Sequence, residues 1–523
     1  MISQRRGFII LIAILILIGG VTRLIPLSSQ ERMVNSVSED GYLMMTIARN
    51  MALGHGMSIA DGTIPTNGTQ PLTTGVWAVG YWLVGGDKIQ GIIFVILLQF
   101  IMASLAALIL WYGGKRLLHN SPHAGTIAAL AAVTWYASPI LVGHTMNGLE
   151  TALYSMCLVG IAMLFSFSNQ NWSMWRWFGL GILLGITFWV RNDASLLIFA
   201  ACVTHLLLGS FEFNALKRRF LQVMLMGATS VIVALPWLIN NVTNFGHLMP
   251  ISGQSESLIA VFAENLPHIP TFLVEYLFVF LPIPHSLDTQ TWVKIACAVF
   301  MVLVLVWMLM RKLHLEERRL TVLISIFTIC LVTFYGLFFG ATYFIDRYMF
   351  PTTPFFALLW ASIVVFIWQR LPAQKITAPI IVLMFITIMA SLHVRSYLFT
   401  KQTSIYHQYL GGYSLHIHLA KWITNNVPED VWVGSWQSGT TGYFHDRTIN
   451  LDGKTNPESL AARQQNKLPE YMLNKDIQYF VDWLNWHKMT VWVERPVVKQ
   501  NYEFVVQDKQ KNLLVMRKKI DNL

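Results

Sequence analysis

Long apolar runs, each followed by a short polar loop, dominate the first 394 residues of the chain. The first run, from Phe8 to Val21, follows Arg5-Arg6, and no small-x-small cleavage site comes after it. We therefore predict a retained transmembrane helix whose N-terminus is cytoplasmic. Further spans are predicted near residues 88–112, 124–142, 149–167, 177–190, 194–210, 220–240, 291–310, 320–342, 348–369 and 376–394, which makes about eleven in total.

The run from Leu72 to Gly86 contains only about fifteen residues, which is short for a full crossing. We predict a helix that lies in or dips into the outer interface of the membrane. It would belong to a first outer loop that spans residues 26–87. If the run from Leu72 to Gly86 were a full crossing, Lys115 and Arg116 would lie on the outer side of the membrane.

The composition agrees with an integral membrane protein. Of the 523 residues, 54% are hydrophobic and 12% are charged, whereas soluble domains carry about 25% charged residues. The formal net charge of +10 does not indicate nucleic-acid binding, because Lys and Arg in a membrane protein mark its topology.

The distribution of Lys and Arg sets the predicted orientation. On the side of the membrane opposite to the cytoplasm, the short loops hold only Arg32, Arg49, Arg191 and Arg347, with Lys88 at a boundary. The loops assigned to the cytoplasm contain Arg5, Arg6, Lys115, Arg116, Arg176, Lys217, Arg218, Arg219, Arg311, Lys312, Arg318, Arg319, Arg370 and Lys375. This bias, together with an odd number of spans, places the first loop and residues 395–523 outside.

The pattern changes after residue 394, where apolar runs become short and polar residues increase. We predict a helix that ends at Asn426-Val427-Pro428, another near 457–473, and strands over 431–436, 448–451, 477–483, 490–494, 503–506 and 513–516. This is a small soluble α/β domain over 395–523, beside a membrane module over 1–394. The four cysteines all fall in predicted spans, so no disulfide framework or cysteine metal site is expected.

The stretch from Ser38 to Gly56 carries two adjacent acids, Glu39 and Asp40, in a region otherwise poor in charge. Apolar residues then recur at spacings of three and four, which predicts a helix with Ser38 as its N-cap and glycines at its end. Both acids would lie in the first turn, where the helix dipole favours the ionised form. The residues alone leave open whether they cap the helix or act chemically.

Unusual polar residues gather on the predicted outer face. They come from separate segments of the chain: Glu39, Asp40, His55, Asp61, Asn67 and Gln70, then His144, Asn147 and Glu150, then Arg191 and Asp193, then His247, Gln254, Glu256, His268 and His285, and finally Asp346 and Arg347. Ionisable groups at the ends of spans are costly unless they are solvated, paired or functional. We therefore predict a polar cavity that opens outward.

Transfer chemistry on that face has no nucleotide sugar to draw on, so an energised donor would be carried by a lipid. Such a transfer needs a carboxylate to accept a proton from the acceptor hydroxyl and cations to stabilise the departing phosphate. The first loop offers the base, and Arg191 and Arg347 are the candidate cations. Each arginine has an acid nearby, Asp193 and Asp346, so a purely structural ion pair remains the alternative.

Several segments resemble the GT-C-type, polyprenyl-phosphate-dependent membrane glycosyltransferases, a group that includes protein O-mannosyltransferases and aminoarabinose transferases. The resemblance is strongest to an arabinofuranosyltransferase-like bacterial branch. It rests on IARNMALGHGMSIADG, TNGTQPL, NGLETALY, WVRNDASLL, PWLINNVTNFGHLMPISGQ, DRYMFPTTP and GYFHDRTINLDGKTNPE, which occur in the order typical of that family.

The resemblance implies roles for particular residues. Asp40 would be the catalytic base, and Glu39 would be a neighbour that orients the acceptor or, alternatively, ligates a metal. Arg191 and Arg347 would contact the donor phosphate, and Glu150 the sugar or acceptor. The remaining candidate substrate-binding residues are His55, Asn67, Gln70 and Asp193.

We therefore predict a polytopic α-helical membrane protein with a GT-C-like fold and a C-terminal α/β domain. It would be an inverting glycosyltransferase that moves a sugar from a polyprenyl-phosphate donor to an acceptor hydroxyl at the outer face of a bacterial cytoplasmic membrane. Its partners would be the lipid donor and the bilayer, and no nucleic acid. No cofactor or metal site is predicted, and the need for a divalent cation stays open.

Two other functional classes remain. A flippase or transporter of lipid-linked glycans would also have many spans, although transporters often show repeated halves with polar groups at mid-membrane. A polysaccharide polymerase or ligase would also use lipid-linked donors, but we expect its main outer loop late in the chain.

Overall fold

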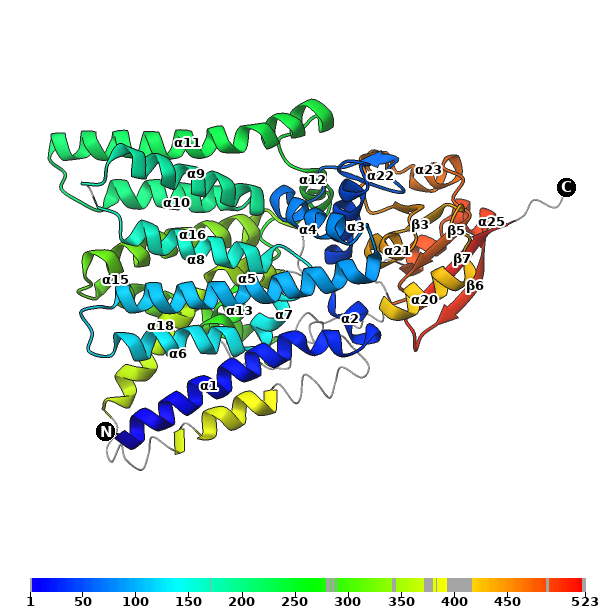
Figure 1. Cartoon of the computed structure of the whole chain (residues 1–523). Helices are drawn as coiled ribbons and strands as arrows, with labels where there is room; N and C mark the ends of the chain where they lie inside the picture. Colours follow the sequence, from blue (N-terminus) through cyan, green and yellow to red (C-terminus); the bar gives the residue numbers. More distant parts are fainter. Residues whose placement is uncertain are drawn as a thin grey trace.

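The computed structural model describes residues 2–169, 171–278, 283, 287, 289–340, 345–370, 380–381, 383–392, 416–485 and 489–519. Figure 1 shows a bundle of roughly parallel helices with a mixed helix-and-strand unit at one end. We call residues 416–519 of this end the C-terminal unit. The molecule thus combines an apolar helical body with a small α/β part, as the sequence predicts.

Helices occupy the described part of each predicted span, which leaves out residues 341–342, 376–379, 382 and 393–394. These elements are α1 (Ile2–Leu24), α5 (Lys88–Leu117), α6 (Ala124–Ala137) with α7 (Pro139–Thr145), α8 (Thr151–Ser166), α9 (Met174–Val190), α10 (Ala194–Leu207), α11 (Phe213–Phe245), α15 (Thr291–Met310), α16 (Leu315–Leu337), α17 (Ile345–Met349) with η3 (Phe350–Thr352) and α18 (Thr353–Trp368), and a helix over Leu383–Leu392. Among the described residues, six spans are long and apolar enough to cross a membrane, and the α6–α7 pair makes up to seven. The others are shorter, so the total of about eleven crossings stays a prediction.

The span predicted near 124–142 is not one straight helix. The axes of α6 and α7 differ by 66° across Ser138-Pro139. Proline has no backbone N–H and fits the first turn of a helix better than its interior, so a new helix begins there. The bend turns α7 toward the end of the bundle where the first outer loop lies (Figure 1).

The segment predicted as the first outer loop, residues 26–87, is largely helical, and we keep that name for it. It contains η1 (Ile25–Ser28), α2 (Gln30–Ser36), α3 (Glu39–Ala52), the short strands β1 (Ser58–Ile59) and β2 (Ile64–Pro65), and α4 (Pro71–Leu83). Ser38 Oγ accepts a hydrogen bond from Gly41 N at 3.0 Å, which confirms the predicted N-cap. Gly54, with φ of 87°, follows the end of α3 in a conformation that favours glycine.

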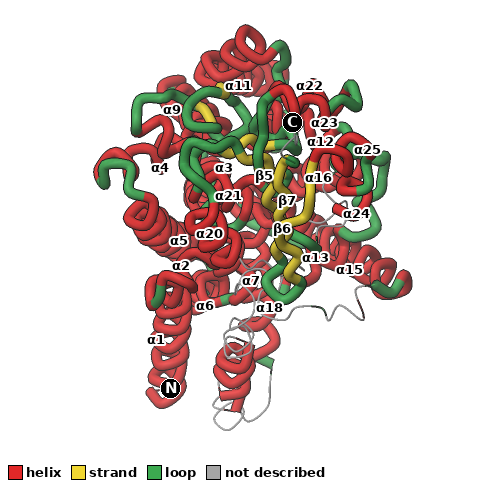
Figure 2. The backbone as a smooth tube through the Cα atoms, turned by 90° about the vertical axis from the view of Figure 1, so that its right-hand side faces the viewer, coloured by secondary structure: helices red, strands yellow, loops and turns green. Residues whose placement is uncertain are grey.

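In the part of the chain that the structure describes, the C-terminal unit contains a five-stranded sheet in the order β4-β3-β5-β7-β6. Its strands are β3 (Val433–Ser435), β4 (Thr448–Asn450), β5 (Tyr479–Asp482), β6 (Tyr502–Asp508) and β7 (Leu513–Lys518). Strand β3 pairs in parallel with β4 and β5, whereas β7 pairs antiparallel with β5 and β6. Figure 2 shows β5, β6 and β7 side by side.

The helices of this unit are α20 (His416–Asn426), α21 (Ser438–Phe444), α22 (Pro457–Gln464), α23 (Leu468–Asn474), α24 (Met489–Val493) and α25 (Pro496–Asn501). The strand predicted over 490–494 is wrong, because this segment is helical. Met489 and Trp492 share one buried face at helical spacing, while Val491 is 69% exposed.

The helix predicted over 457–473 is two helices rather than one. Asn466, with φ of 57°, turns the chain between α22 and α23, and Pro469 lies in the first turn of α23. The predicted domain boundary at 394 and 395 lies outside the described residues.

Candidate active site

The structure contains a cavity of about 410 Å³. The elements that line it meet where the helical bundle joins the C-terminal unit (Figure 1). The cavity lining comes from α3, from the α9–α10 junction, from α12 (Ile251–Ser257), from α17 and from the loop after β4. Six of the predicted site residues line it: Asp40, Gln70, Glu150, Arg191, Asp193 and Arg347. The polar cavity expected from the sequence is therefore present, and it joins segments that are far apart in the chain.

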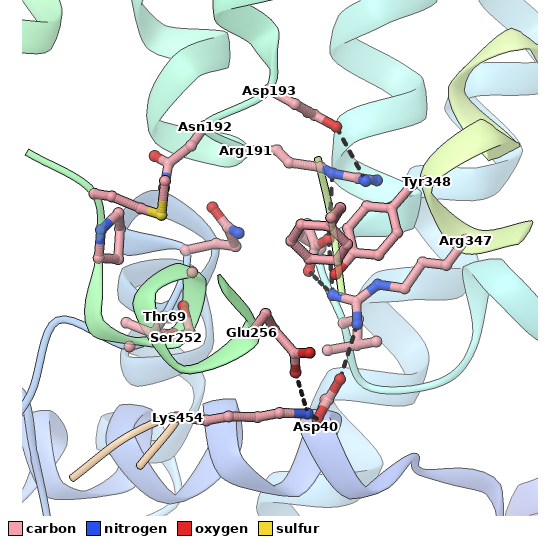
Figure 3. Close-up of a pocket in the computed structure, with 18 of the residues that line it drawn as sticks. Asp40, Thr69, Arg191, Asn192, Asp193, Ser252, Glu256, Arg347, Tyr348 and Lys454 are labelled. Atoms are coloured by element: carbon pink, nitrogen blue, oxygen red, sulfur yellow. Dashed lines mark hydrogen bonds and ion pairs between the residues drawn. The ribbon is translucent and has the colours of Figure 1, made fainter. Parts of the chain in front are cut away.

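Arg347 connects two of the cavity's carboxylates. Its Nη1 lies 3.0 Å from Asp40 Oδ2, and its Nη2 lies 3.2 Å from Glu150 Oε1 (Figure 3). The alternative pair with Asp346 is not formed, because Asp346 faces His144 instead, with its Oδ2 3.5 Å from the histidine Nε2. The Arg347 guanidinium thus fixes the position of the predicted base.

Arg191 lies in the extended break between α9 and α10. Its Nη2 is 3.0 Å from Asp193 Oδ2, and its Nε is 3.8 Å from Glu150 Oε1. The guanidinium carbon also lies 5.3 Å from the Tyr154 ring centroid and 5.2 Å from that of Tyr348. Rings, carboxylates and burial hold this cation at one wall of the cavity.

A third cation enters from the C-terminal unit. Lys454 Nζ is 2.9 Å from Glu256 Oε1 on α12 and 3.9 Å from Asp40 Oδ1. Figure 3 shows its side chain extended beneath Glu256 toward Asp40. Four carboxylates (Asp40, Glu150, Asp193 and Glu256) and three cations (Arg191, Arg347 and Lys454) therefore line one cavity.

The charges around Asp40 determine its protonation. Burial would raise the pKa of Asp40, but the positive charges of Lys454 and Arg347 outweigh this effect and hold the pKa below its usual range. Burial alone would lower the pKa of Lys454, yet Asp40 and Glu256 raise it well above its ordinary value. Asp40 is therefore ionised near neutral pH and able to accept a proton.

Glu39 does not face the cavity. Its Oε1 accepts a hydrogen bond from Thr440 N at 2.9 Å, and its Oε2 accepts one from Thr440 Oγ1 at 2.8 Å. His416 Nδ1 lies 3.2 Å from the same Oε2. Burial raises the pKa of Glu39 to about 8, so this acid joins α3 to the C-terminal unit as a neutral group near pH 7.

Two other predicted contacts also lie away from the cavity lining. Asn67 is buried and donates to Asn241 Oδ1 at 2.9 Å, while its Oδ1 accepts from Ile251 N at 3.1 Å. It thereby ties the first loop to the segment before α12. His55 is exposed and packs beside Gly62 at the loop surface.

Several other residues that line the cavity were not predicted as catalytic or substrate-binding, among them Asn192, Glu256, Tyr335, Tyr348 and Lys454. Glu256 belongs to the polar residues predicted on the outer face, and Lys454 belongs to the segment GYFHDRTINLDGKTNPE, which carries the family resemblance. Their positions along the chain give no indication that either residue lies close to Asp40. Among the described residues, no group of three or more His, Cys, Asp or Glu side chains is arranged to hold a metal ion.

Comparison with solved structures identifies the architecture. ArnT from Cupriavidus metallidurans bound to undecaprenyl phosphate superposes with a TM-score of 0.55 at 11% identity, covering 97% of each chain. Its apo state gives 0.53 at 12% identity with the same coverage. The oligosaccharyltransferase of Archaeoglobus fulgidus, tethered with an acceptor peptide, gives 0.51 at 11% identity and covers 99% of this chain and 74% of that one.

The chain has the GT-C fold. This finding confirms the predicted fold class of a helical membrane protein with a C-terminal α/β part. A model described as a domain of unknown function (DUF8728) matches residues 403–513 and thus covers most of the C-terminal unit. No curated protein matches the sequence. At 11–12% identity, the likeness to these structures establishes the fold alone.

Proposed function

We propose that the protein is an inverting glycosyltransferase that uses a polyprenyl-phosphate sugar. The observation that carries the proposal is an ionised carboxylate, Asp40, beside Arg347 and Lys454 in a cavity of a GT-C fold. A structural relative with this fold, ArnT, binds undecaprenyl phosphate.

In the proposed reaction, Asp40 accepts the proton of an acceptor hydroxyl. The hydroxyl oxygen forms a bond to the anomeric carbon of the sugar, and the bond from that carbon to the phosphate oxygen breaks. The electron pair leaves with the polyprenyl phosphate, whose charge Arg347 and Arg191 stabilise. Attack opposite to the leaving group inverts the anomeric configuration.

The other site residues support this arrangement. Glu150 and Asp193 hold Arg347 and Arg191 in place, and Gln70 is a candidate contact for a sugar hydroxyl. Glu39, Asn67 and His55 are not proposed as substrate contacts, because their side chains lie elsewhere.

We further propose a membrane module over residues 1–394 and an outer α/β domain over 395–523, with the cavity on the outer face of a bacterial cytoplasmic membrane. The basic residues of the opposite loops support this orientation. The multi-pass membrane character itself agrees with the apolar helices.

The test uses purified protein in liposomes with a polyprenyl-phosphate sugar labelled in both the sugar and the lipid. A transferase releases unglycosylated polyprenyl phosphate and moves the sugar label to a hydroxyl acceptor supplied as a membrane extract. Passage of the intact labelled lipid across the bilayer, with no cleavage, would instead support a flippase and overturn the proposal.

A further inference from the structure

The loop after β4 brings one lysine of the C-terminal unit to the carboxylate of Asp40. Lys454 Nζ lies 2.9 Å from Glu256 and 3.9 Å from Asp40, and its side chain is only 21% exposed. A flexible surface lysine would lie in water, where exposed ion pairs contribute little. This lysine is enclosed between α3 and α12.

The backbone of this loop is fixed by its own hydrogen bonds. Asn450 Oδ1 accepts from Gly453 N at 3.0 Å, and Asp452 Oδ1 accepts from Lys454 N at 2.8 Å. Gly453 has φ of 78°, which favours glycine. The lysine side chain therefore leaves from a defined turn.

The loop after β4 also contacts α12 on one side and the first outer loop on the other. Ser255 Oγ on α12 donates to Asp452 O at 2.7 Å. On the other side, a Cβ added to Gly68 would lie 2.0 Å from Lys454 O, so the two backbones are in direct contact. The position of Lys454 thus depends on how the C-terminal unit sits against the first outer loop.

We propose that Lys454 is a positioning residue for Asp40, so that the C-terminal unit completes the site and is more than a cover. Lys454 and Arg347 each lie nearest to a different oxygen of the carboxylate. Arg347 contacts Oδ2 and Lys454 approaches Oδ1. The inference rests on the proposed function for the role of Asp40 as the base.

The charges that face Asp40 come from several elements. Arg347 on α17 and Lys454 attract the Asp40 carboxylate. Arg347 also pairs with Glu150, and Lys454 also pairs with Glu256. Glu39 and Tyr348 lie close enough to Asp40 to interact with it electrostatically. Lys454 is first among the charges that lower the pKa of Asp40 against the effect of burial. Removing its charge must therefore make Asp40 easier to protonate.

The experiment measures the protonation of Asp40 without requiring any sugar transfer. The full-length protein in detergent micelles is treated with a carbodiimide and an amine, which modify protonated carboxyl groups, and mass spectrometry follows the peptide with Asp40 across pH. In Lys454→Met the midpoint of modification moves to higher pH. Lys454→Arg, which keeps the charge, returns it toward the wild-type value.

The matched control is Lys475→Met, which removes a lysine from the ion pair with Glu458 on the surface of the same unit. Its midpoint stays at the wild-type pH. The inference is overturned if Lys454→Met and wild type share one midpoint, or if Lys475→Met shifts the midpoint equally.

A second variant excludes unfolding as the cause of a shift. Glu256→Gln removes the carboxylate that competes for the ammonium of Lys454, so the midpoint for Asp40 moves to lower pH. Loosening of the structure would move both variants in the same direction, which would contradict the inference.

The same variants separate this inference from the proposed function. If the chain transfers sugar, the acid limb of its kcat/KM profile moves to higher pH in Lys454→Met, because the base is then protonated at higher pH. The modification midpoint of Asp40 could move to higher pH in Lys454→Met and to lower pH in Glu256→Gln although the protein never cleaves a lipid-linked sugar. That result would support the Lys454–Asp40 coupling and overturn the proposed function.

Discussion

Two adjacent acids at the start of α3 have different surroundings. Successive residues of a helix differ by about 100° around its axis, so Glu39 and Asp40 point to different neighbours. Asp40 faces Arg347 and Lys454 in the cavity, whereas Glu39 is buried against Thr440 and His416. The carboxylate of Asp40 is therefore kept ionised, whereas the carboxyl group of Glu39 is kept neutral.

The neutral acid predicts a pH dependence of stability. Burial raises the pKa of Glu39 from 4.5 to about 8, so the folded state binds a proton that the unfolded state has lost. The free energy of unfolding must then fall between about pH 5 and pH 8 and level off above that range. Thermal unfolding of Glu39→Gln in detergent should show a weaker decrease over the same range. A residual decrease is expected from Asp482, whose pKa burial raises to about 7. Identical pH profiles for both proteins would contradict this assignment.

The Arg347–Glu150 pair predicts a strong dependence of stability on the arginine. The two side chains are 13% and 0% exposed, and removal of one partner from a buried pair costs about 3–5 kcal/mol because the other charge is left uncompensated. Arg347→Met should lower the free energy of unfolding by that amount. Adding Glu150→Gln should restore part of it, and simple additivity of the two losses would argue against the pair.

At the level of elements, backbone contacts hold the first outer loop against the C-terminal unit. A Cβ on Gly439 at α21 would lie 2.0 Å from Glu39 O, and one on Gly68 would lie 2.0 Å from Lys454 O. Neither glycine has a positive φ, so the need for glycine comes from close approach. These contacts bring α3 and the loop after β4 together around the cavity.

Gly68→Ala tests this contact. The added methyl group must push the loop after β4 away from Gly68, and overpacking of this kind typically costs about 1–3 kcal/mol. We expect a lower melting temperature and a loss of transfer activity. The control is Gly75→Ala within α4, where nothing lies within 4 Å of the added Cβ, and alanine favours the helix by about 1 kcal/mol. Equal effects of the two variants would contradict the proposed contact.

Local patterns predicted most elements and missed those that depend on distant partners. The cap at Ser38, the end of α3 and the segments of all five strands of the C-terminal sheet follow from side-chain periodicity and turn residues. The segment 490–494 alternates like a strand, yet Trp492 packs against Trp436 with ring centroids 5.3 Å apart. That tertiary contact favours the helix α24, and the local pattern does not contain it.

At the scale of the whole molecule, one cavity is assembled from segments along nearly the full chain. The sequence predicted a shared polar face because Asp40, Glu150, Arg191 and Arg347 all follow or precede apolar spans. It did not predict Lys454, because a lysine in a polar loop is ordinarily solvated. Only the docking of the C-terminal unit places that lysine beside Asp40.

The proposed orientation predicts which loops can be reached from outside. A cysteine that replaces Lys475, an exposed residue of the C-terminal unit, should react with a membrane-impermeant maleimide in spheroplasts. A cysteine that replaces His119, exposed in the loop after α5, should react only after the membrane is opened. The parent protein, whose native cysteines lie within helices, sets the background. The reverse labelling pattern would place the cavity in the cytosol and rule out the proposed donor.

The role of Asp40 is tested most directly by the release of labelled polyprenyl phosphate from a lipid-linked sugar. Asp40→Asn keeps the size of the side chain but cannot accept the proton, so transfer should fall by about 10²–10⁴-fold while the protein stays folded. The matched control is Asp61→Asn, in the same outer loop and 43% exposed, which should retain wild-type release. Wild-type release by Asp40→Asn would contradict the account.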